Sequence, residues 1–454
     1  MAKETKTKVT LPPGRTYHVP LELDRLYEGL EDVGVGPRYI SHIRKGEWHL
    51  ELGGPKHDYV SFVQSLVVND PSQVEDGLVE LIGPDINEVP PETSLPFGIL
   101  VKVYGPELKV DHSDYVERTA VMGLLFLEGF MLVGARNHVW VRISKRNVSR
   151  LNFKKLGQSI RASILTQCPI AEAVEIQMVI GAEEIGGKDL IDQLLAEAKE
   201  RWEAIDAQIK GINDEEVDLF YGCSICKMIA PNHACIITPS TLPYCGIMSY
   251  HSAKAIYDID PTGYLFEVPV GDVLDPVMGW YTGVDKIIWE RSGHRHKRFH
   301  LFSTIKYPTT NCGCFEAASY YIPEVDGIGL AQRRYFGNTP VGIPFSKMAG
   351  MMSGGGQNHG FKGISVLTIR SPKFLQGDGG WNRIVWMPKS LKLELADVIP
   401  EEVYEKIATE EDCIEPQDLK RFLKEKKHPI VEKRWKNGEP QPLEVPLPGE
   451  DWPE

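Results

Sequence analysis

Residues 221–246 read YGCSICKMIAPNHACIITPSTLPYCG, and the cysteines of this stretch decide what the second half of the chain must fold around. Cys223, Cys226, Cys235 and Cys245 follow one another with gaps of two, eight and nine residues. One close pair with two further thiols on nearby loops suits a cubane 4Fe–4S cluster. A tetrahedral zinc site also begins with such a pair, but the second close pair common in zinc ribbons is missing. The spacing therefore favours iron–sulfur and leaves zinc as the alternative.

A second motif, Cys312-Gly313-Cys314, changes the balance between these alternatives. Two thiolates and the two backbone nitrogens between them can form a planar N2S2 donor set. A d8 ion such as Ni(II) prefers this square-planar field, whereas zinc gains nothing from it. Glycine in the middle leaves the plane unobstructed, because it has no Cβ. Taken alone, the tripeptide could also be a redox pair or two cysteines facing opposite sides of a strand.

Composition limits the class of protein. The 454 residues, 42% of them hydrophobic, suit two or three domains with sizeable cores. A formal net charge of −13 argues against a nucleic-acid partner, which would need a basic face. The start, MAKETKTKV, lacks a secretory signal, and the most apolar stretch, 120–135, is shorter than a bilayer requires and contains Glu128. We therefore expect a buried helix there, no membrane association, and a reducing cytoplasm in which thiols can bind metal.

The pattern of apolar residues predicts a mixed α/β and α+β fold in four parts. Residues 1–45 are a polar lead-in, and 46–210 form an α/β layered domain. Residues 211–398, rich in Gly, Pro, Cys and aromatic residues, form a loop-rich α+β domain around the cluster, and 399–454 form charged helices and a tail. In the first domain, strands are expected at 78–82, 97–104, 139–143 and 174–180. Helices are expected at 57–67, 115–134, 154–166 and 188–209.

At the cysteine motifs the sequence resembles a known family, acetyl-CoA synthase. The resemblance is carried by 221–246, by TNCGCFEAASYYIPEVDGIG (310–329), by SGGGQNHGFKGIS (353–365) and by QGDGGWNRIVWMP (376–388). It extends over roughly residues 20–450. The family is the nickel subunit of the carbon monoxide dehydrogenase/acetyl-CoA synthase complex, which serves carbon fixation in anaerobic bacteria and archaea.

The resemblance implies the metal centre of that family. A 4Fe–4S cubane would be held by Cys223, Cys226, Cys235 and Cys245, and Cys226 would bridge it to a proximal nickel. Cys312 and Cys314 would bridge this nickel to a distal nickel in the plane of Cys312-Gly313-Cys314. The implied reaction joins CO and a methyl group from a corrinoid protein and transfers the acetyl group to coenzyme A, which makes the protein an acyltransferase. The implied partners are carbon monoxide dehydrogenase, a corrinoid iron–sulfur protein and ferredoxin.

Two departures from the family pattern stand out. The chain begins without the additional N-terminal domain that docks the dehydrogenase in the large bacterial enzymes, and in this it resembles the shorter archaeal-type subunit. The family places Phe three residues after the bridging cysteine, against the proximal nickel, and this chain has Ile229. The substrate pocket is therefore expected to be apolar and wider.

A basic stretch suggests where coenzyme A could bind. Residues 142–161 contain seven basic residues and no acid, which suits the phosphates of that ligand. Trp140 and Arg142 share one face of a predicted strand, so the indole could stack on adenine while Arg142 and Arg146 pair with phosphate. The family's proposed coenzyme A region also carries a Trp-x-Arg pattern. The alternative is a core tryptophan beside a solvated basic helix face.

Two further functions compete with the nickel enzyme. An electron-transfer protein would need a lone 4Fe–4S cluster and no Cys312-Gly313-Cys314 motif. A scaffold subunit would need only a structural zinc site. The metal content separates the three.

Overall fold

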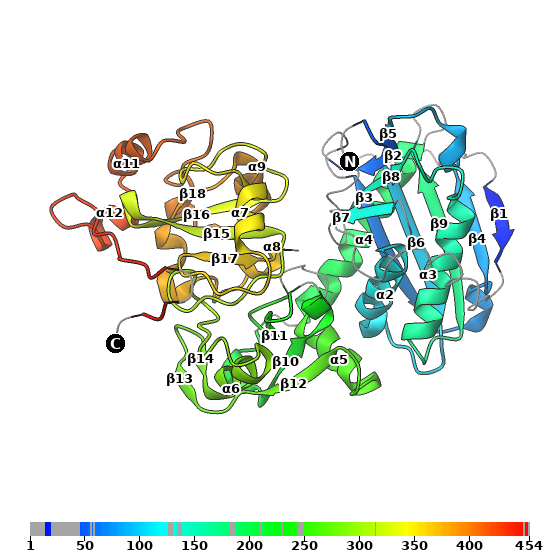
Figure 1. Ribbon diagram of the computed structural model, residues 1–454, viewed down its shortest axis with the longest axis horizontal. Coiled ribbons are helices and arrows are strands. Elements are labelled where there is room, and N and C mark those ends of the chain that lie inside the picture. The colour runs from blue at the N-terminus through cyan, green and yellow to red at the C-terminus, as the bar shows by residue number, and fades with distance from the viewer. Residues whose placement is uncertain are drawn as a thin grey trace, which may run out of the picture. The chain divides into compact units, whose positions relative to one another are not determined.

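The computed structural model describes residues 14–19, 46–54, 57, 60–125, 130–133, 139–181, 187–208, 211–228, 230–243, 249–313, 315–447 and 450–452. The chain forms two compact units, residues 1–208 and 209–454 (Figure 1). Each mixes sheets with helices, so the predicted mixed α/β fold class is confirmed.

The first unit is built on a five-stranded mixed sheet in the order β1-β4-β9-β6-β3. The pairs β4–β9 and β6–β3 are parallel, whereas β1–β4 and β9–β6 are antiparallel. Strand bounds are β1 (Arg15–His18), β3 (Ser61–Val68), β4 (Leu78–Ile82), β6 (Phe97–Tyr104) and β9 (Ala173–Ile180). Even the lead-in segment thus contributes an edge strand.

Helices cover both faces of this sheet (Figure 1). Val79 and Ile82 point to opposite faces of β4, because side chains alternate along a strand. Gly157 of α3 (Phe153–Gln167) lies so close to Val79 that an added Cβ would be 2.7 Å from its methyl groups. Ile82 packs in one core cluster with Ile191 of α4 (Gly187–Ala207), so α3 and α4 lie on opposite sides. Helix α2 (Ser113–Leu125) packs against α3 and β3.

A smaller four-stranded sheet completes the first unit, in the order β5-β2-β8-β7. Its strands are β2 (Trp48–Gly53), β5 (Thr93–Leu95), β7 (Phe130–Val133) and β8 (Trp140–Ser144). Strand β8 pairs antiparallel with β2, which sets Arg142 opposite Glu51 and Trp140 opposite Gly53.

Two predicted helices of this unit are wrong in whole or in part. The apolar pattern predicts a helix at 57–67, but 61–68 form β3, a strand paired along its whole length with β6. A parallel strand is buried on both faces, so its apolar run shows no alternation and resembles a buried helix. The helix expected over 115–134, and the buried helix over 120–135, end at Leu125, because 130–133 form β7.

The second unit contains three sheets of modest size, as Figure 1 shows. The order β11-β10-β12 joins β10 (Leu219–Cys223), β11 (Cys235–Ile237) and β12 (Leu265–Pro269). The order β17-β15-β16-β18 joins β15 (Ala317–Ile322), β16 (Gly327–Gln332), β17 (Phe361–Ile364) and β18 (Ile384–Trp386). Strands β13 (Val273–Asp275) and β14 (Trp280–Tyr281) form a hairpin.

Short helices surround these sheets and share their core. Their bounds are α5 (Tyr250–Ile259), α6 (Thr282–Arg291), α7 (Phe345–Met352), α8 (Val366–Ile369), α9 (Lys389–Glu394), α10 (Glu401–Tyr404), α11 (Pro416–Glu425) and α12 (Pro429–Lys433). Val403 and Ile407 are buried in one cluster with Ile328 of β16 and Ile364 of β17. The first part of the charged C-terminal segment thus shares the core of the sheet.

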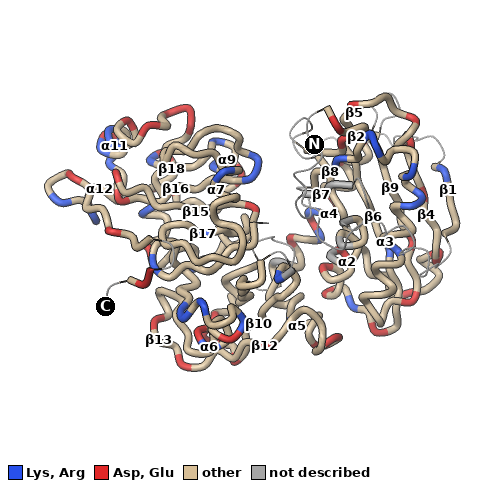
Figure 2. The backbone as a smooth tube through the Cα atoms, viewed as in Figure 1, with Lys and Arg blue, Asp and Glu red and all other residues tan. Residues whose placement is uncertain are grey.

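The distribution of charged and apolar residues singles out no acidic segment and no membrane-crossing helix among the described residues. Figure 2 shows acidic and basic residues spread over the tubes of both units, so the excess of acid is not gathered in one segment. Among the described residues, no helix combines the length and the apolar character that crossing a bilayer requires.

Candidate metal centre

Two of the predicted cluster ligands face one another across a strand pair. Cys223 ends β10 and Cys235 begins β11, and the antiparallel register makes them direct partners. Side chains at such positions lie on one face with Cβ atoms about 4.5–5.5 Å apart. Both side chains are buried. The short 3-10 helix Ile225–Met228 carries Cys226, which is half-buried, so three of the predicted thiolates lie on one strand–turn–strand segment.

Thr310 brings the second cysteine motif to this segment. Its hydroxyl oxygen accepts a hydrogen bond from the backbone N–H of Ala234 at 3.1 Å. It also lies 3.0 Å from Nδ1 of His233. Ala234 is the neighbour of Cys235, and Thr310 precedes Cys312 by two residues. Thr310, His233 and Ala234 are almost fully buried, so this contact fixes the two cysteine-bearing segments side by side.

A glycine loop fills the space between the two segments. Gly355 has φ of +84°, and an added Cβ would lie 2.7 Å from the backbone nitrogen of His233. The N–H of Gly355 donates to the carbonyl of Asn311 at 2.8 Å. Gly313 has φ of +98°, a conformation that favours glycine, and its added Cβ would lie 3.0 Å from Cβ of Ser353. The loop 353–356 therefore contacts both cysteine segments through backbone atoms.

Hydrogen bonds with the β17-β15-β16-β18 sheet and with the residue that follows β16 hold the Cys312 segment. The side-chain amide oxygen of Asn311 accepts a hydrogen bond from the N–H of Gly363, in β17, at 2.6 Å. Arg333, the residue after β16, donates from Nη2 to the carbonyl oxygens of Gly313 and Phe315, both at 2.8 Å. Residues 311–315 thus have fixed polar partners on both sides of position 314.

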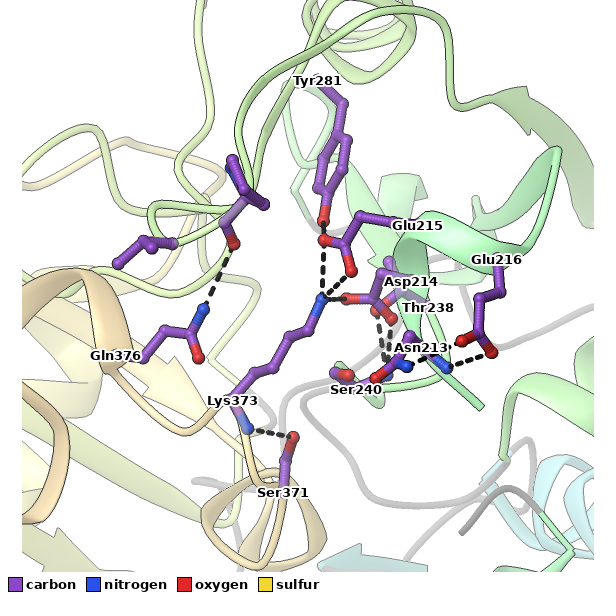
Figure 3. Close-up of polar contacts among 12 residues, drawn as sticks. Asn213, Asp214, Glu215, Glu216, Thr238, Ser240, Tyr281, Ser371, Lys373 and Gln376 are labelled. Atoms are coloured by element: carbon purple, nitrogen blue, oxygen red, sulfur yellow. Dashed lines mark hydrogen bonds and ion pairs between the residues drawn. The ribbon is translucent and has the colours of Figure 1, made fainter. Parts of the chain in front are cut away.

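An ionic cluster around the buried Asp214 holds Ser240, in the segment that follows β11 (Figure 3). The backbone N–H of Ser240 donates to Oδ1 of Asp214 at 2.9 Å. Nζ of Lys373 lies between the carboxylates of Asp214 and Glu215, at 3.8 Å and 2.6 Å. Tyr281 donates its hydroxyl proton to Glu215 at 2.9 Å. Because Asp214 has no exposed surface, burial raises the pKa of its carboxyl group to about 6.

Three predicted residues, Ile229, Cys245 and Cys314, lie outside the described part of the chain. Among the residues that the structure does describe, no three histidine, cysteine, aspartate or glutamate side chains converge as ligands of one ion. Thiolates of a cubane bind four different irons and are more widely spaced than the ligands of a single ion. The described donors are soft, buried sulfurs beside a glycine without steric bulk, and this donor set fits iron–sulfur and nickel ligation.

The candidate coenzyme A residues lie in the first unit and have a partner that the sequence did not suggest. Glu51, 3% exposed, accepts hydrogen bonds on Oε2 from Trp140 Nε1 at 3.1 Å and from Arg142 Nε at 2.8 Å. The Arg142 guanidinium carbon lies 4.5 Å from the centroid of the Trp140 ring. Arg146 is exposed. The tryptophan and arginine do share a face, but a buried carboxylate already offsets the charge of Arg142.

Sequence reasoning missed the residues that position the cysteines. His233 and Thr310 stand inside the quoted cysteine stretches, in PNHAC and TNCGC, and a search for polar residues next to each ligand could have found them. Arg333 and Glu51 give no such signal, because each reaches its partners across a sheet from a distant part of the chain.

Comparison with known proteins adds an independent observation. Residues 32–185 match the family described as CO dehydrogenase/acetyl-CoA synthase complex beta subunit. Residues 202–434 match the family that describes the C-terminal part of the ACS/CODH beta subunit. Both stretches together span the two units.

Named relatives agree with these matches. The acetyl-CoA decarbonylase/synthase complex subunit beta 2 of Methanocaldococcus jannaschii is 42% identical over 403 residues, which cover 88% of this chain and 83% of that protein. The beta subunit of Methanopyrus kandleri is 42% identical over 408 residues, covering 89% and 85%. Subunit beta 1 of M. jannaschii is 44% identical over 403 residues, but this chain spans only 52% of its length.

Proposed function

The chain belongs to the family of CO dehydrogenase/acetyl-CoA synthase complex beta subunits, and from this premise we propose that it forms or cleaves acetyl-CoA at a nickel–iron–sulfur centre in its second unit. The observation that carries the proposal is the contact of Thr310 with His233 and Ala234. It sets the Cys312-Gly313 segment beside the segment that bears Cys235, as a centre shared by both motifs requires.

The proposed ligands divide between two tasks. Cys223, Cys226, Cys235 and Cys245 would hold a 4Fe–4S cubane, and Cys226 would also be a ligand of a proximal nickel. Cys312, Gly313 and Cys314 would hold a distal nickel through two thiolates and two backbone nitrogens. When bound, the nickel pair supplies sites at which CO and a methyl group can be joined and passed to the sulfur of coenzyme A.

The protein contributes position and the exclusion of water. Burial of Cys223, Cys235 and Cys312 keeps solvent away from the sulfurs. The glycine loop 353–356 lets backbone approach both cysteine segments, because a side chain at Gly355 would collide with the backbone of His233. Ile229 provides the proposed apolar wall of the substrate site, and no general base is needed among these residues.

The finer assignments concern substrates and partners. As an acyltransferase, the chain takes CO, a corrinoid-bound methyl group and coenzyme A, the last at Trp140, Arg142 and Arg146. Its relatives are named as subunits of a complex, which supports an assembly with carbon monoxide dehydrogenase and a corrinoid iron–sulfur protein, with ferredoxin as a further electron partner.

Metal analysis of anaerobically purified protein tests the proposal. We expect about four iron and two nickel atoms per chain, with iron lost in Cys235→Ser and nickel lost in Cys312→Ser. Cys168→Ser is the matched control, because this buried thiol lies in the first unit and is outside both motifs. Iron without nickel would indicate an electron-transfer protein, and zinc alone would indicate a scaffold module.

Activity is tested by reconstitution. Apo-protein loaded with iron, sulfide and nickel should form acetyl-CoA from CO, a methyl-corrinoid and coenzyme A. The same protein loaded with copper or zinc in place of nickel should not, because thiolate bridges accept those ions without supplying the chemistry of nickel. Acetyl-CoA formation with copper or zinc alone would refute this point.

A further inference from the structure

The side chain of Arg333 contacts backbone carbonyl groups in and next to the Cys312-Gly313-Cys314 motif. Its Nη2 donates to the carbonyl oxygens of Gly313 and Phe315, both at 2.8 Å. Its backbone N–H donates to the carbonyl oxygen of Glu316 at 2.9 Å. The guanidinium carbon lies 5.4 Å from the ring centroid of Phe345 in α7. Backbone and side chain of Arg333 thus bond the carbonyl oxygens of Gly313, Phe315 and Glu316. The residue is half-buried.

The carbonyl of Gly313 has a special place in the proposed donor set. The oxygen of Gly313 and the nitrogen of residue 314 belong to one planar peptide group and share its electrons. When nickel takes the place of the proton on that nitrogen, negative charge spreads onto this oxygen, and the proton leaves to solvent. Two thiolates and two such nitrogens carry four negative charges against the two positive charges of Ni(II). The plane therefore gains from a fixed cation beside it.

We propose that Arg333 is a positioning residue for the nickel in the Cys312-Gly313-Cys314 plane, where it orients the peptide and offsets its negative charge. The inference rests on the proposed function, because it assumes nickel at this motif. An arginine suits the task, since its guanidinium stays charged and the two N–H groups of its Nη2 can hold two carbonyl oxygens at once. A hydrogen bond from a charged donor is also roughly twice as strong as one between neutral groups.

The hydrogen bond from Arg333 to the carbonyl of Phe315 fixes the position of the charged guanidinium beside Gly313. By bonding the carbonyl oxygens of both Gly313 and Phe315, the guanidinium holds the peptide group that follows Gly313 and the one that follows Phe315 in one arrangement. The positive φ of Gly313 favours glycine at this position, and Ser353 leaves little room for a side chain there, since an added Cβ would lie 3.0 Å from the Cβ of Ser353. Lysine at position 333 would keep the charge but would lack the planar guanidinium that fixes the direction of the N–H donors.

Nickel affinity measured by competition with a chelator tests the inference. Apo-protein is loaded with nickel alone under anaerobic conditions, and the visible circular dichroism of planar Ni(II) is followed during titration with the chelator. We expect Arg333→Met to weaken nickel binding about 10- to 100-fold, the range for loss of a charge-assisted hydrogen bond. Arg333→Lys should fall between Arg333→Met and the unmodified protein. Arg421→Met, at an exposed ion pair with Asp418 in α11, is the control and should bind nickel as the unmodified protein does.

The outcomes separate this inference from the proposed function. Unmodified protein without a planar nickel spectrum would overturn the proposed nickel site itself. A normal spectrum with equal nickel affinity in Arg333→Met and Arg421→Met would overturn only the role of Arg333. If Arg333→Met also lowers the unfolding temperature, Arg333→Lys decides. A stable lysine variant with partly restored nickel affinity supports the role, and one with no restoration overturns it.

Discussion

Replacing Gly355 with alanine should separate the two cysteine segments, and its neighbour Gly354 offers a control with the same backbone strain. Gly354 has φ of +94° and Gly355 has φ of +84°. Alanine in the left-handed region costs about 1–2 kcal/mol at either position. An added Cβ at Gly354 would have no atom of the described residues within 4 Å, whereas at Gly355 it would meet the nitrogen of His233 at 2.7 Å and the carbonyl carbon of Asn232 at 3.0 Å.

The collision at Gly355 involves backbone, which cannot rotate away as a flexible side chain could. Overpacking of this kind costs about 1–3 kcal/mol beyond the strain that both variants share. Gly355→Ala should therefore destabilise the contact between loop 353–356 and His233 by about 1–3 kcal/mol more than Gly354→Ala. A difference of this size corresponds to roughly 5- to 150-fold faster local opening.

Hydrogen–deuterium exchange with mass spectrometry measures that opening directly. Peptides covering 230–243 and 305–313 should exchange faster in Gly355→Ala than in Gly354→Ala, since the hydrogen bond from Gly355 to Asn311 belongs to the same contact. Iron and nickel content should fall in the same order. Equal exchange and equal metal content in the two variants would refute the idea that this loop holds the cysteine segments together.

Three further predictions follow from buried charges. Burial raises the pKa of Asp214 from 3.8 to about 6, so its contribution to stability is complete below about pH 3.8 and is lost as the pH rises through 6. The free energy of unfolding in urea, measured as Asp214→Asn minus the unmodified protein, should therefore rise by about 3 kcal/mol between pH 4 and pH 7. A difference that stays constant with pH would contradict this. Asp326→Asn should lower the free energy of unfolding by about 3–5 kcal/mol, because it leaves buried arginine charge unpaired. Asp418→Asn, at an exposed ion pair, should change it by less than about 1 kcal/mol. Glu51→Gln should tighten coenzyme A binding, measured by quenching of tryptophan fluorescence, if Arg142 binds phosphate, and unchanged affinity would place coenzyme A elsewhere.

The strands of the first unit show what local sequence determines. The predicted strands 78–82 and 97–104 are confirmed residue for residue as β4 and β6, because turn-forming residues bound each apolar run. Residues 61–68 escape this reasoning because their strand character comes from pairing with β6, a partner 36 residues away at every position of the register. Local periodicity carries no information about a neighbour of that kind.

For the proposed metal centre, the sequence predicts the donor atoms and gives no sign of the residues that bring their segments together. Cysteine spacing can be read directly, since each ligand must be a cysteine and the motif is short. Thr310 and Arg333 act through geometry that spans 76 and 20 residues along the chain. In the sequence, an arginine that bonds a backbone carbonyl looks the same as an arginine whose charge faces solvent. The roles of Thr310 and Arg333 can be recognised only from the folded structure, which shows the groups that their side chains contact.

The contacts around the cysteines suggest how the protein and the metal divide the task of forming the site. In a zinc finger the metal supplies most of the folding free energy, and the chain has few other interactions. Here the Cys312 segment is held by Thr310, Asn311 and Arg333, each through hydrogen bonds to protein groups. The first two residues are fully buried, so these bonds lie in a low-dielectric interior where they are strong. At the proposed centre, the free energy of metal binding would therefore not be needed to bring these segments together.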